Sequence, residues 1–214
     1  MTPKKYFKRI LINFISITFA FMENKNPKLY MIMLGATPDG RLTEQHDIFF
    51  GIGTSLKELI PDMNAFWPEA NGKIHIDCWR EITYVDGYSI EITSREAIIE
   101  SSEKLFFLNL GGYKENEFEE YHYKLLSVSK NLSLASKKSK LTAFFKHFNF
   151  KNENSKGGVA HIDDKYGIDI DDAFNVQDIL SEHYKEKYQL KISPSEGIEE
   201  DILHIGYVKI SSLK

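Results

Sequence analysis

Two apolar runs of strand length mark the chain, one in each half, and only the second is interrupted by a polar residue, Asn109. They cover residues 29–34 and 105–110, and glycine follows each directly, as Gly35 and Gly111. Apolar runs of four to eight residues bounded by turn-forming residues are typical of buried strands. We therefore predict a buried strand at the start of each half.

The two runs belong to a longer repeat. Residues 28–59 align without a gap on residues 104–135, 76 positions later. Similarity at a fixed offset is the signature of a duplicated structural unit. We therefore predict one α+β domain built from two tandem units related by internal duplication. The identical pairs are Lys28/Lys104, Leu29/Leu105, Leu34/Leu110, Gly35/Gly111, Glu44/Glu120, His46/His122 and Leu56/Leu132.

The apolar pattern after Gly35 predicts a helix. A turn-forming segment, residues 36–41, leads to Thr43 as a candidate N-cap, and Pro61 supplies a stop signal. The sequence therefore predicts a helix over residues 43–59. Its core-facing positions, at helical spacing, are Ile48, Ile52, Leu56 and Leu59.

An alternating segment and a turn complete the predicted unit. Residues 74–79 alternate as a half-buried strand does, and Asp86–Gly87 between two short apolar runs is a strong hairpin signal. Each unit is therefore predicted as β-α-β-β. The second unit is expected to have its helix near residues 118–134, a strand near 141–148 and a last strand over 166–170, followed by a helix over 176–184 and a short strand over 203–210.

These patterns give four predicted segments. Residues 1–27 form an N-terminal extension, 28–95 the first β-α-β-β repeat, 104–170 the second repeat, and 171–214 a C-terminal helix and strand. The two repeats are expected to place their sheets side by side or face to face.

Several stretches of the first repeat resemble a known family. They are Met33-Leu34-Gly35, residues 40–51, Trp67-Pro68-Glu69-Ala70 and His75-Ile76-Asp77. They resemble an uncharacterised bacterial family known only as a domain of unknown function (domain of unknown function 1543), which occurs in one or two copies per protein. The resemblance extends over residues 28–92 and more loosely over the second repeat. It implies a compact bacterial α/β unit and brings no activity with it.

Composition limits the classes of partner. The 214 residues carry a net charge of −4 and a pI near 6.0, which argues against a general attraction to nucleic acid or anionic membranes. Cys78 is the single cysteine, so an intramolecular disulfide is excluded and a reducing compartment fits best. We therefore expect a cytoplasmic protein.

The N-terminus leaves this location open. Basic residues at positions 4, 5, 8 and 9 precede an apolar run over 10–22, which is the order of an export signal without its small-residue cleavage pattern. Translation that starts at Met22 and a helical appendage or membrane anchor are the two other interpretations.

The predicted strand-to-helix turn of the first repeat is a candidate anion site. Gly35 and Gly40 would expose backbone N–H groups at a helix start, Thr43 would cap the helix, and Arg41 could add a bidentate contact. The glycine spacing matches neither phosphate-binding fingerprint, so a plain turn is the alternative.

Three polar residues on the predicted helix are catalytic candidates. His46 could act as a general acid or base, oriented by Glu44 or Asp47. On a helix, however, residues two apart face different directions, so Glu44 and His46 would not meet. A structural histidine at the edge of the apolar stripe is the competing interpretation.

The sequence also contains candidate metal ligands and candidate recognition residues. His75 and Asp77 share one face of a predicted strand, and His161 and Asp163 repeat the spelling, but these pairs are not equivalent in the aligned repeats. We therefore expect no metal site and no cofactor, and we expect Cys78 to pack. Trp67 and Trp79 are candidate interface anchors.

Three functional hypotheses remain. The first is a small intracellular binding or regulatory module that holds an anionic ligand or a protein through the first-repeat loop and the tryptophans. The second is an acid-base enzyme acting on a phosphate- or carboxylate-bearing small molecule, with Arg41 as anion anchor. The third is single-stranded nucleic-acid binding through residues 137–148, where lysines and phenylalanines alternate.

Overall fold

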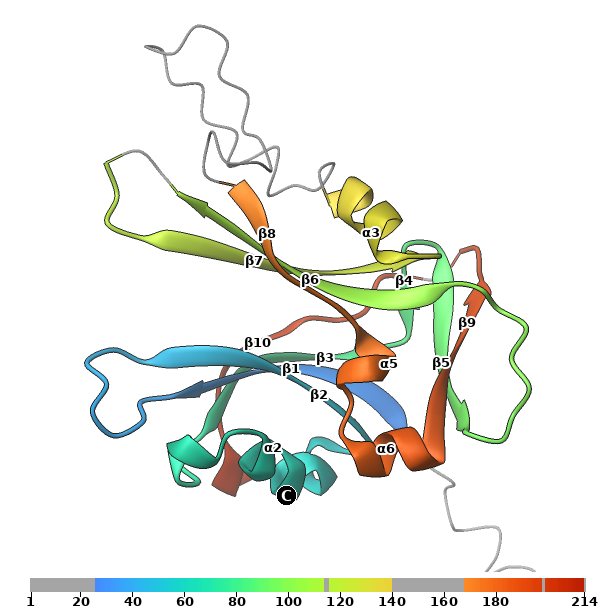
Figure 1. Cartoon of the computed structure of the whole chain (residues 1–214). Helices are drawn as coiled ribbons and strands as arrows, with labels where there is room; N and C mark the ends of the chain where they lie inside the picture. The colour runs from blue at the N-terminus through green and yellow to red at the C-terminus, as the bar shows by residue number, and fades with distance from the viewer. Residues whose placement is uncertain (1–25, 114–115, 140–167, 198, 214) are drawn as a thin grey trace, which may run out of the picture.

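Antiparallel strands dominate the computed structural model, which describes residues 26–113, 116–139, 168–197 and 199–213 (Figure 1). Among these residues no helix is long and apolar enough to cross a membrane. The elements are β1 (Lys28–Ala36), β2 (Gln45–Gly53), the 3-10 helix η1 (Leu56–Leu59), α2 (Ile60–Phe66), η2 (Pro68–Ala70), β3 (His75–Ile82), β4 (Tyr84–Val85), β5 (Tyr88–Ser94), β6 (Lys104–Tyr113), β7 (Glu120–Ser129), α3 (Leu132–Ser139), β8 (Ile168–Asn175), α5 (Val176–Ile179), α6 (Glu182–Lys187), β9 (Tyr188–Pro194), β10 (His204–Lys209) and η3 (Ile210–Ser212).

The strands form three sheets. The first has the order β10-β3-β1-β2, the second β7-β6-β8 and the third β4-β5-β9. Figure 1 shows the first two sheets stacked face to face, with α2 beneath the first, α3 above the second and the third sheet closing one end. Strands from the C-terminal part of the chain thus join all three sheets.

The helix predicted over residues 43–59 is wrong, because residues 45–53 form strand β2. Both faces of β2 are covered, so its buried residues run continuously from Phe49 to Gly53 and satisfy a helical period as well as a strand period. Gly51 and Gly53 disfavour a helix, whereas isoleucine and phenylalanine favour a strand. Pro61 lies in the first turn of α2 and begins that helix instead of ending one.

The same error occurs in the second unit. Residues 120–129 form β7, and the helix follows only at α3. In both units the described elements therefore follow the order strand, strand, helix, strand, with residues 140–167 of the second unit outside the described part. The last strand, β8, pairs with β6 as β3 pairs with β1, so it takes the place of β3 and not the place of β5 that the sequence predicted.

Other sequence predictions are confirmed. β1, β3, β6 and β10 lie where strands were expected, and Asp86 and Gly87 both have positive φ, at 55° and 87°, as the β4–β5 turn requires. The C-terminal helix is divided into α5 and α6, and β9 was missed. The predicted strand over 141–148 and the N-terminal extension lie outside the described residues, except for positions 26 and 27.

The two main sheets share one strand register. Lys28 lies opposite Gly53 in the first hairpin, and Lys104 lies opposite Ser129 in the second. Pairing with the third strand shifts at the equivalent step of both sheets, between residues 33 and 34 and between residues 109 and 110. Each shift is a β-bulge at one aspartate of the third strand, Asp77 in β3 and Asp171 in β8.

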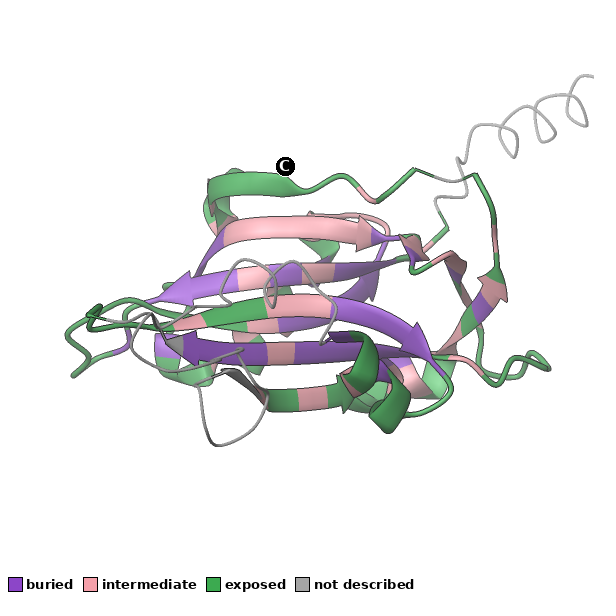
Figure 2. Cartoon of the chain, turned by 90° about the horizontal axis from the view of Figure 1, so that it is seen from above, coloured by how far each residue is buried: buried purple, intermediate pink, exposed green. Residues whose placement is uncertain are grey.

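Two kinds of contact hold the sheets together. The Phe50 and Phe107 rings meet edge to face across the interface, with their centroids 5.5 Å apart. Asp86, at the β4–β5 turn, accepts hydrogen bonds from the Ser127 hydroxyl (2.8 Å) and the Val128 N–H (2.9 Å) of β7. The residues that begin β2 and β7 are mostly exposed, whereas the C-terminal halves of both strands are buried, and Figure 2 shows this burial along the strands.

Candidate functional site: a cleft between two sheets

A cleft of about 600 Å³ lies between the first and second sheets. That volume falls in the range of small-molecule sites. Its walls combine apolar side chains with a few charged groups. The residues that line it are Met31, Met33, Ile48, Cys78, Trp79, Arg80, Tyr84, Val85, Asp86, His122, Tyr123, Lys124, Leu125, Leu126, Glu200, Asp201, Leu203 and Ile205.

Strand alternation explains which side chains face the cleft. Met31 and Met33 of β1 lie opposite Arg80 and Cys78 of β3, and paired residues of neighbouring strands point to the same face. On β2 this face carries Ile48, the partner of Met33. The floor therefore consists of thioether, thiol and alkyl groups, with one guanidinium among them.

Two cations reach the cleft from opposite sheets, Arg80 from β3 and Lys124 from β7. Both are partly buried. Burial lowers the pKa of Arg80, and the carboxylates of Asp201 and Glu200 partly oppose this. Burial likewise lowers the pKa of Lys124. Within the described part of the chain neither cation has a carboxylate within 4 Å, so both retain hydrogen-bond donors for another group.

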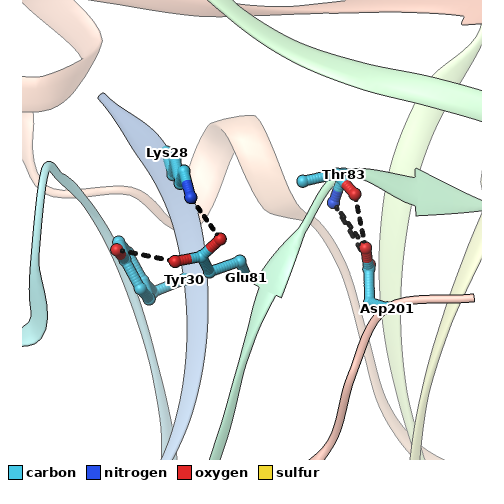
Figure 3. A network of polar contacts seen from close by, with 5 residues as sticks. All are labelled: Lys28, Tyr30, Glu81, Thr83 and Asp201. Carbon is cyan, nitrogen blue, oxygen red and sulfur yellow. Dashed lines mark hydrogen bonds and ion pairs between the residues drawn. The ribbon is translucent and has the colours of Figure 1, made fainter. Parts of the chain in front are cut away.

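Two of the cleft's carboxylates are already engaged by other groups of the protein. Asp201 accepts from the Thr83 hydroxyl at 2.6 Å, from the Thr83 N–H at 3.0 Å and from the Tyr84 N–H at 3.4 Å (Figure 3). Asp86 is held by β7, and Lys138 Nζ lies 3.5 Å from it. The cleft therefore holds two cations without an ion-pair partner among the described residues, while the oxygens of Asp201 and Asp86 already accept hydrogen bonds from neighbouring groups, which favours an anion.

Cys78 lies on the cleft floor, where the charges of Lys124 and Arg80 both act on its thiol. Burial, with the charge of Asp77, raises the pKa of its thiol, and Lys124 and Arg80 oppose the shift. A thiol with a raised pKa is a poor nucleophile at neutral pH. Cys78 is therefore a packed thiol, as the sequence predicted, and both cations are close enough to act on it.

A polar cluster lies at the hairpin end of the same sheet face. Gly35 pairs with His46 on one side and with His75 on the other. His46 Nε2 lies 3.3 Å from Asp77 Oδ2 and 3.7 Å from Glu44 Oε2. His75 Nε2 lies 2.9 Å from Glu44 Oε1 and 3.3 Å from Asp77 Oδ1. Each carboxylate thus places one oxygen near each imidazole.

The second sheet carries a related cluster at the equivalent place. His122, opposite Gly111, has its Nδ1 3.1 Å from Asp171 Oδ2 and its Nε2 3.9 Å from Glu120 Oε2. Glu120 and His122 are the counterparts of Glu44 and His46 in the repeat, and Asp171 occupies the bulge that Asp77 occupies in β3.

The prediction that Glu44 and His46 face apart is wrong, because it assumed a helix. Residues two apart on an extended chain project to one face, and here the two side chains meet. The structure adds His75 and Asp77 to them, a grouping that the sequence reasoning missed. The available signal was the shared His-x-Asp and Glu-x-His spacing of two, which is a strand pattern.

The predicted anion loop meets this cluster only through Gly35 and Glu44, and no contact among the described residues links Arg41 or Thr43 to it. Residues 37–44 make the β1–β2 connection, with a turn closed by the Arg41 N–H to the Pro38 carbonyl and with Gly40 at φ 82°. Arg41 and Thr43 are exposed, and Thr43 caps no helix, since none begins there. Asp47 accepts from the neighbouring Ile48 N–H at 2.7 Å. The predicted anion site relied on the N-terminus of a helix, and the described residues 37–53 contain no helix.

The two tryptophans lie in different environments. Trp67 ends α2 and packs partly buried against the core. Trp79 contributes to the cleft wall, but its ring stacks on His204 at a centroid distance of 3.8 Å and lies 6.1 Å from the Tyr30 ring. A single recognition surface made of both tryptophans stays a prediction without support from these contacts.

Several predicted groups lie outside the described residues. His161 and Asp163 are among them, as are residues 140–148 of the lysine- and phenylalanine-rich segment. α3 lies on the outer side of the second sheet (Figure 1), with Lys137 and Lys138 in its last turn, and Lys138 Nζ lies 3.5 Å from Asp86. The nucleic-acid hypothesis therefore stays a prediction.

Comparison with known proteins is consistent with the family resemblance. Residues 41–92 match the family described as Domain of Unknown Function (DUF1543), so the assignment made from the sequence is confirmed for that segment. No curated protein matches the chain. The crystal structure of a protein Il1583 from Idiomarina loihiensis is similar in fold, with a TM-score of 0.57 and 20% identity, over 85% of this chain and 96% of that one.

Proposed function

We propose that this protein is a binding module for a small organic anion with an apolar body, held in the cleft between the two main sheets. The observation that carries the proposal is the pair Arg80 and Lys124, drawn from opposite sheets into one cleft without an ion-pair partner among the described residues. Partial burial of these two cations costs solvation free energy, and charge-assisted hydrogen bonds to a bound anion would offset that cost.

The chemistry of the walls supports the rest of the ligand's description. Methionine and leucine side chains adapt to flat or irregular apolar groups, and Met31, Met33 and Leu126 face the cleft. Leu203 and Ile205 are largely exposed at its rim, so a ligand that covers them would bury apolar surface. A sulfonate, carboxylate or phosphate on an aromatic or alkyl body meets both requirements.

The proposal keeps the leading hypothesis from the sequence and moves its site. The anion contact passes from Arg41 in the loop to Arg80 and Lys124 in the cleft. The acid-base alternative loses its anchor, because Arg41 does not join His46. The single cysteine supports a reducing compartment, as expected of a cytoplasmic protein.

We also infer that the two main sheets descend from one duplicated unit. Their common register, their bulges at the equivalent step and the identical glycines beneath the bulges support this origin. The unit is β-β-α-β, with one copy on each side of the cleft. Arg80 and Lys124 are not equivalent in the repeat, so the anion site is a later, asymmetric feature of the pair.

The test uses two matched probes, naphthalene-2-sulfonate and the uncharged 2-naphthalenemethanol. Isothermal titration should show saturable binding of the sulfonate to the full chain and weaker binding of the alcohol. Arg80→Gln and Lys124→Gln should each weaken sulfonate binding about tenfold or more, because a hydrogen bond to a charged group contributes about 1.5–3 kcal/mol. Binding of the alcohol should change little.

Lys73→Gln is the matched control, because Lys73 is exposed and does not line the cleft. It should bind the sulfonate as the unmodified protein does. Equal binding of the two probes, or equal losses in the control and in the two cleft variants, would show that the cations do not select the ligand.

A further inference from the structure

We propose that Glu44, His46, His75 and Asp77 form a binding site for one divalent transition-metal ion. The site lies at the hairpin end of the first sheet, where β1, β2 and β3 meet. It does not depend on the anion bound in the cleft. Two imidazole nitrogens and two carboxylates are a ligand set that suits zinc and its neighbours in the first transition row.

The side chains surround a common space. Glu44 and Asp77 each turn one oxygen toward His75 and the other toward His46, at 2.9–3.7 Å. Neighbouring ligand atoms of a tetrahedral ion with bonds of about 2.0–2.2 Å lie about 3.3–3.6 Å apart, which the four nitrogen–oxygen distances already approach. The cluster as a whole must close until its ligand atoms lie within 4.8 Å of one another, as those of Glu120, His122 and Asp171 do. Glu44 and His46 are exposed near the hairpin end and can make that adjustment.

The buried side of the cluster gives an independent sign of a missing ligand. His75 is 8% exposed, and its Nε2 has no hydrogen-bond partner although two carboxylate oxygens lie within 3.3 Å. Asp77 Oδ2 is also buried without a hydrogen bond. Buried polar atoms nearly always form a hydrogen bond. Two neighbouring buried atoms that form none, His75 Nε2 and Asp77 Oδ2, therefore indicate a bound ion.

The backbone is shaped to make room for the cluster. A Cβ at Gly35 would collide with the His75 ring and the Asp77 carboxylate. His75 lies directly opposite Gly35, and Asp77 is the extra residue of the adjacent bulge. Both side chains therefore reach the space over Gly35. The Tyr207 ring packs on the His75 ring, with their centroids 4.5 Å apart, and helps to fix the orientation of the imidazole.

The second sheet repeats the arrangement with different residues. Glu120, His122 and Asp171 can bring one ligand atom each to within 4.8 Å of one another. A Cβ at Gly111 would collide with the Asp171 carboxylate, as one at Gly35 would with Asp77. Three exposed groups hold an ion less firmly than four with a buried histidine, so the first-sheet site should be the tighter one.

The test measures metal binding by the full chain after removal of metal with a chelator. Titration with Zn²⁺ in competition with a chromophoric chelator should show one tight site. Co²⁺ held by the four ligands should give intense visible d–d absorption bands, because a tetrahedral site lacks an inversion centre. His75→Ala should raise the Zn²⁺ Kd at least about 100-fold, since even partners of metal ligands contribute 10- to 100-fold.

Two further variants keep the test decisive. His46→Ala should also weaken the tight site, and its exposed position makes misfolding no obstacle if His75→Ala fails to fold. His183→Ala is the control, because His183 lies 3.4 Å from Asp62 in a histidine–carboxylate pair outside the cluster. It should leave the Zn²⁺ Kd unchanged.

Three results would overturn the proposal. They are the absence of a tight Zn²⁺ site, a tight site that survives both His75→Ala and His46→Ala, and a tight site that is lost in His122→Ala but kept in His75→Ala. A failure of sulfonate binding in the cleft would leave this site untouched, so the two proposals can fail separately.

Discussion

The stacking of the two main sheets predicts a measurable coupling between Phe50 and Phe107. Their rings meet edge to face at 5.5 Å, and both are at least 93% buried. Such aromatic pairs contribute about 0.5–1.5 kcal/mol beyond the surface they bury. Phe50→Leu and Phe107→Leu should each destabilise the protein by about 1–2 kcal/mol. The double variant should be less destabilised than their sum by about 1 kcal/mol.

The assay is urea unfolding of the four proteins, followed by circular dichroism, with the free energy of unfolding taken from the midpoint and slope. A second cycle with Phe49 and Phe107 is the control. Phe49 points to the other face of β2, where it meets Phe66 at 5.5 Å. Its coupling to Phe107 should stay below about 0.5 kcal/mol. Equal couplings in the two cycles would refute the face-to-face packing on which the cleft depends.

Three further outcomes follow from single side chains. Asp201→Ala should destabilise the protein by about 1–2 kcal/mol in urea unfolding, because Thr83 and Tyr84 lose a charged acceptor; an unchanged midpoint would contradict the contact. Asp86→Ala should cost a similar amount, since the Val128 N–H loses its partner; Asp86→Asn should retain part of that stability. Burial, reinforced by Glu81, raises the pKa of Tyr30 from 10.0 to about 12. The unfolded chain therefore ionises first, and the protein should lose about 2–3 kcal/mol between pH 10 and pH 12. Tyr30→Phe should lose less over that range.

The sequence predicted strands well where their signals were local. The apolar run ending at Gly35, the alternation that begins β3 and the Asp86–Gly87 turn each carry their structure within a few residues. β2 and β7 were mistaken for helices because sheet stacking buries both faces of their C-terminal halves. Periodicity cannot separate a strand buried on both faces from a buried helix, and only the tertiary arrangement decides.

The candidate sites could not be predicted from the sequence, because they depend on which strands are neighbours and on how the strands pair. His75 meets His46 because β1 lies between β2 and β3, an order that the sequence does not state. Asp77 reaches the same space through a bulge, which local patterns rarely reveal. Arg80 was not selected from the sequence, because a lone arginine in a strand carries no signal until a second sheet is placed over it.

The most direct measurement of the anion-binding cleft is the rate at which a neutral thiol reagent, iodoacetamide, modifies Cys78. This single cysteine lies on the cleft floor, where the charges of Arg80 and Lys124 act on its thiol. Saturating naphthalene-2-sulfonate should slow the modification at least about tenfold in the unmodified protein, with a concentration dependence that matches the Kd. The protection should be lost in Arg80→Gln at the same ligand concentration. A rate that does not respond to the sulfonate, although the sulfonate binds, would place the ligand elsewhere and contradict the account.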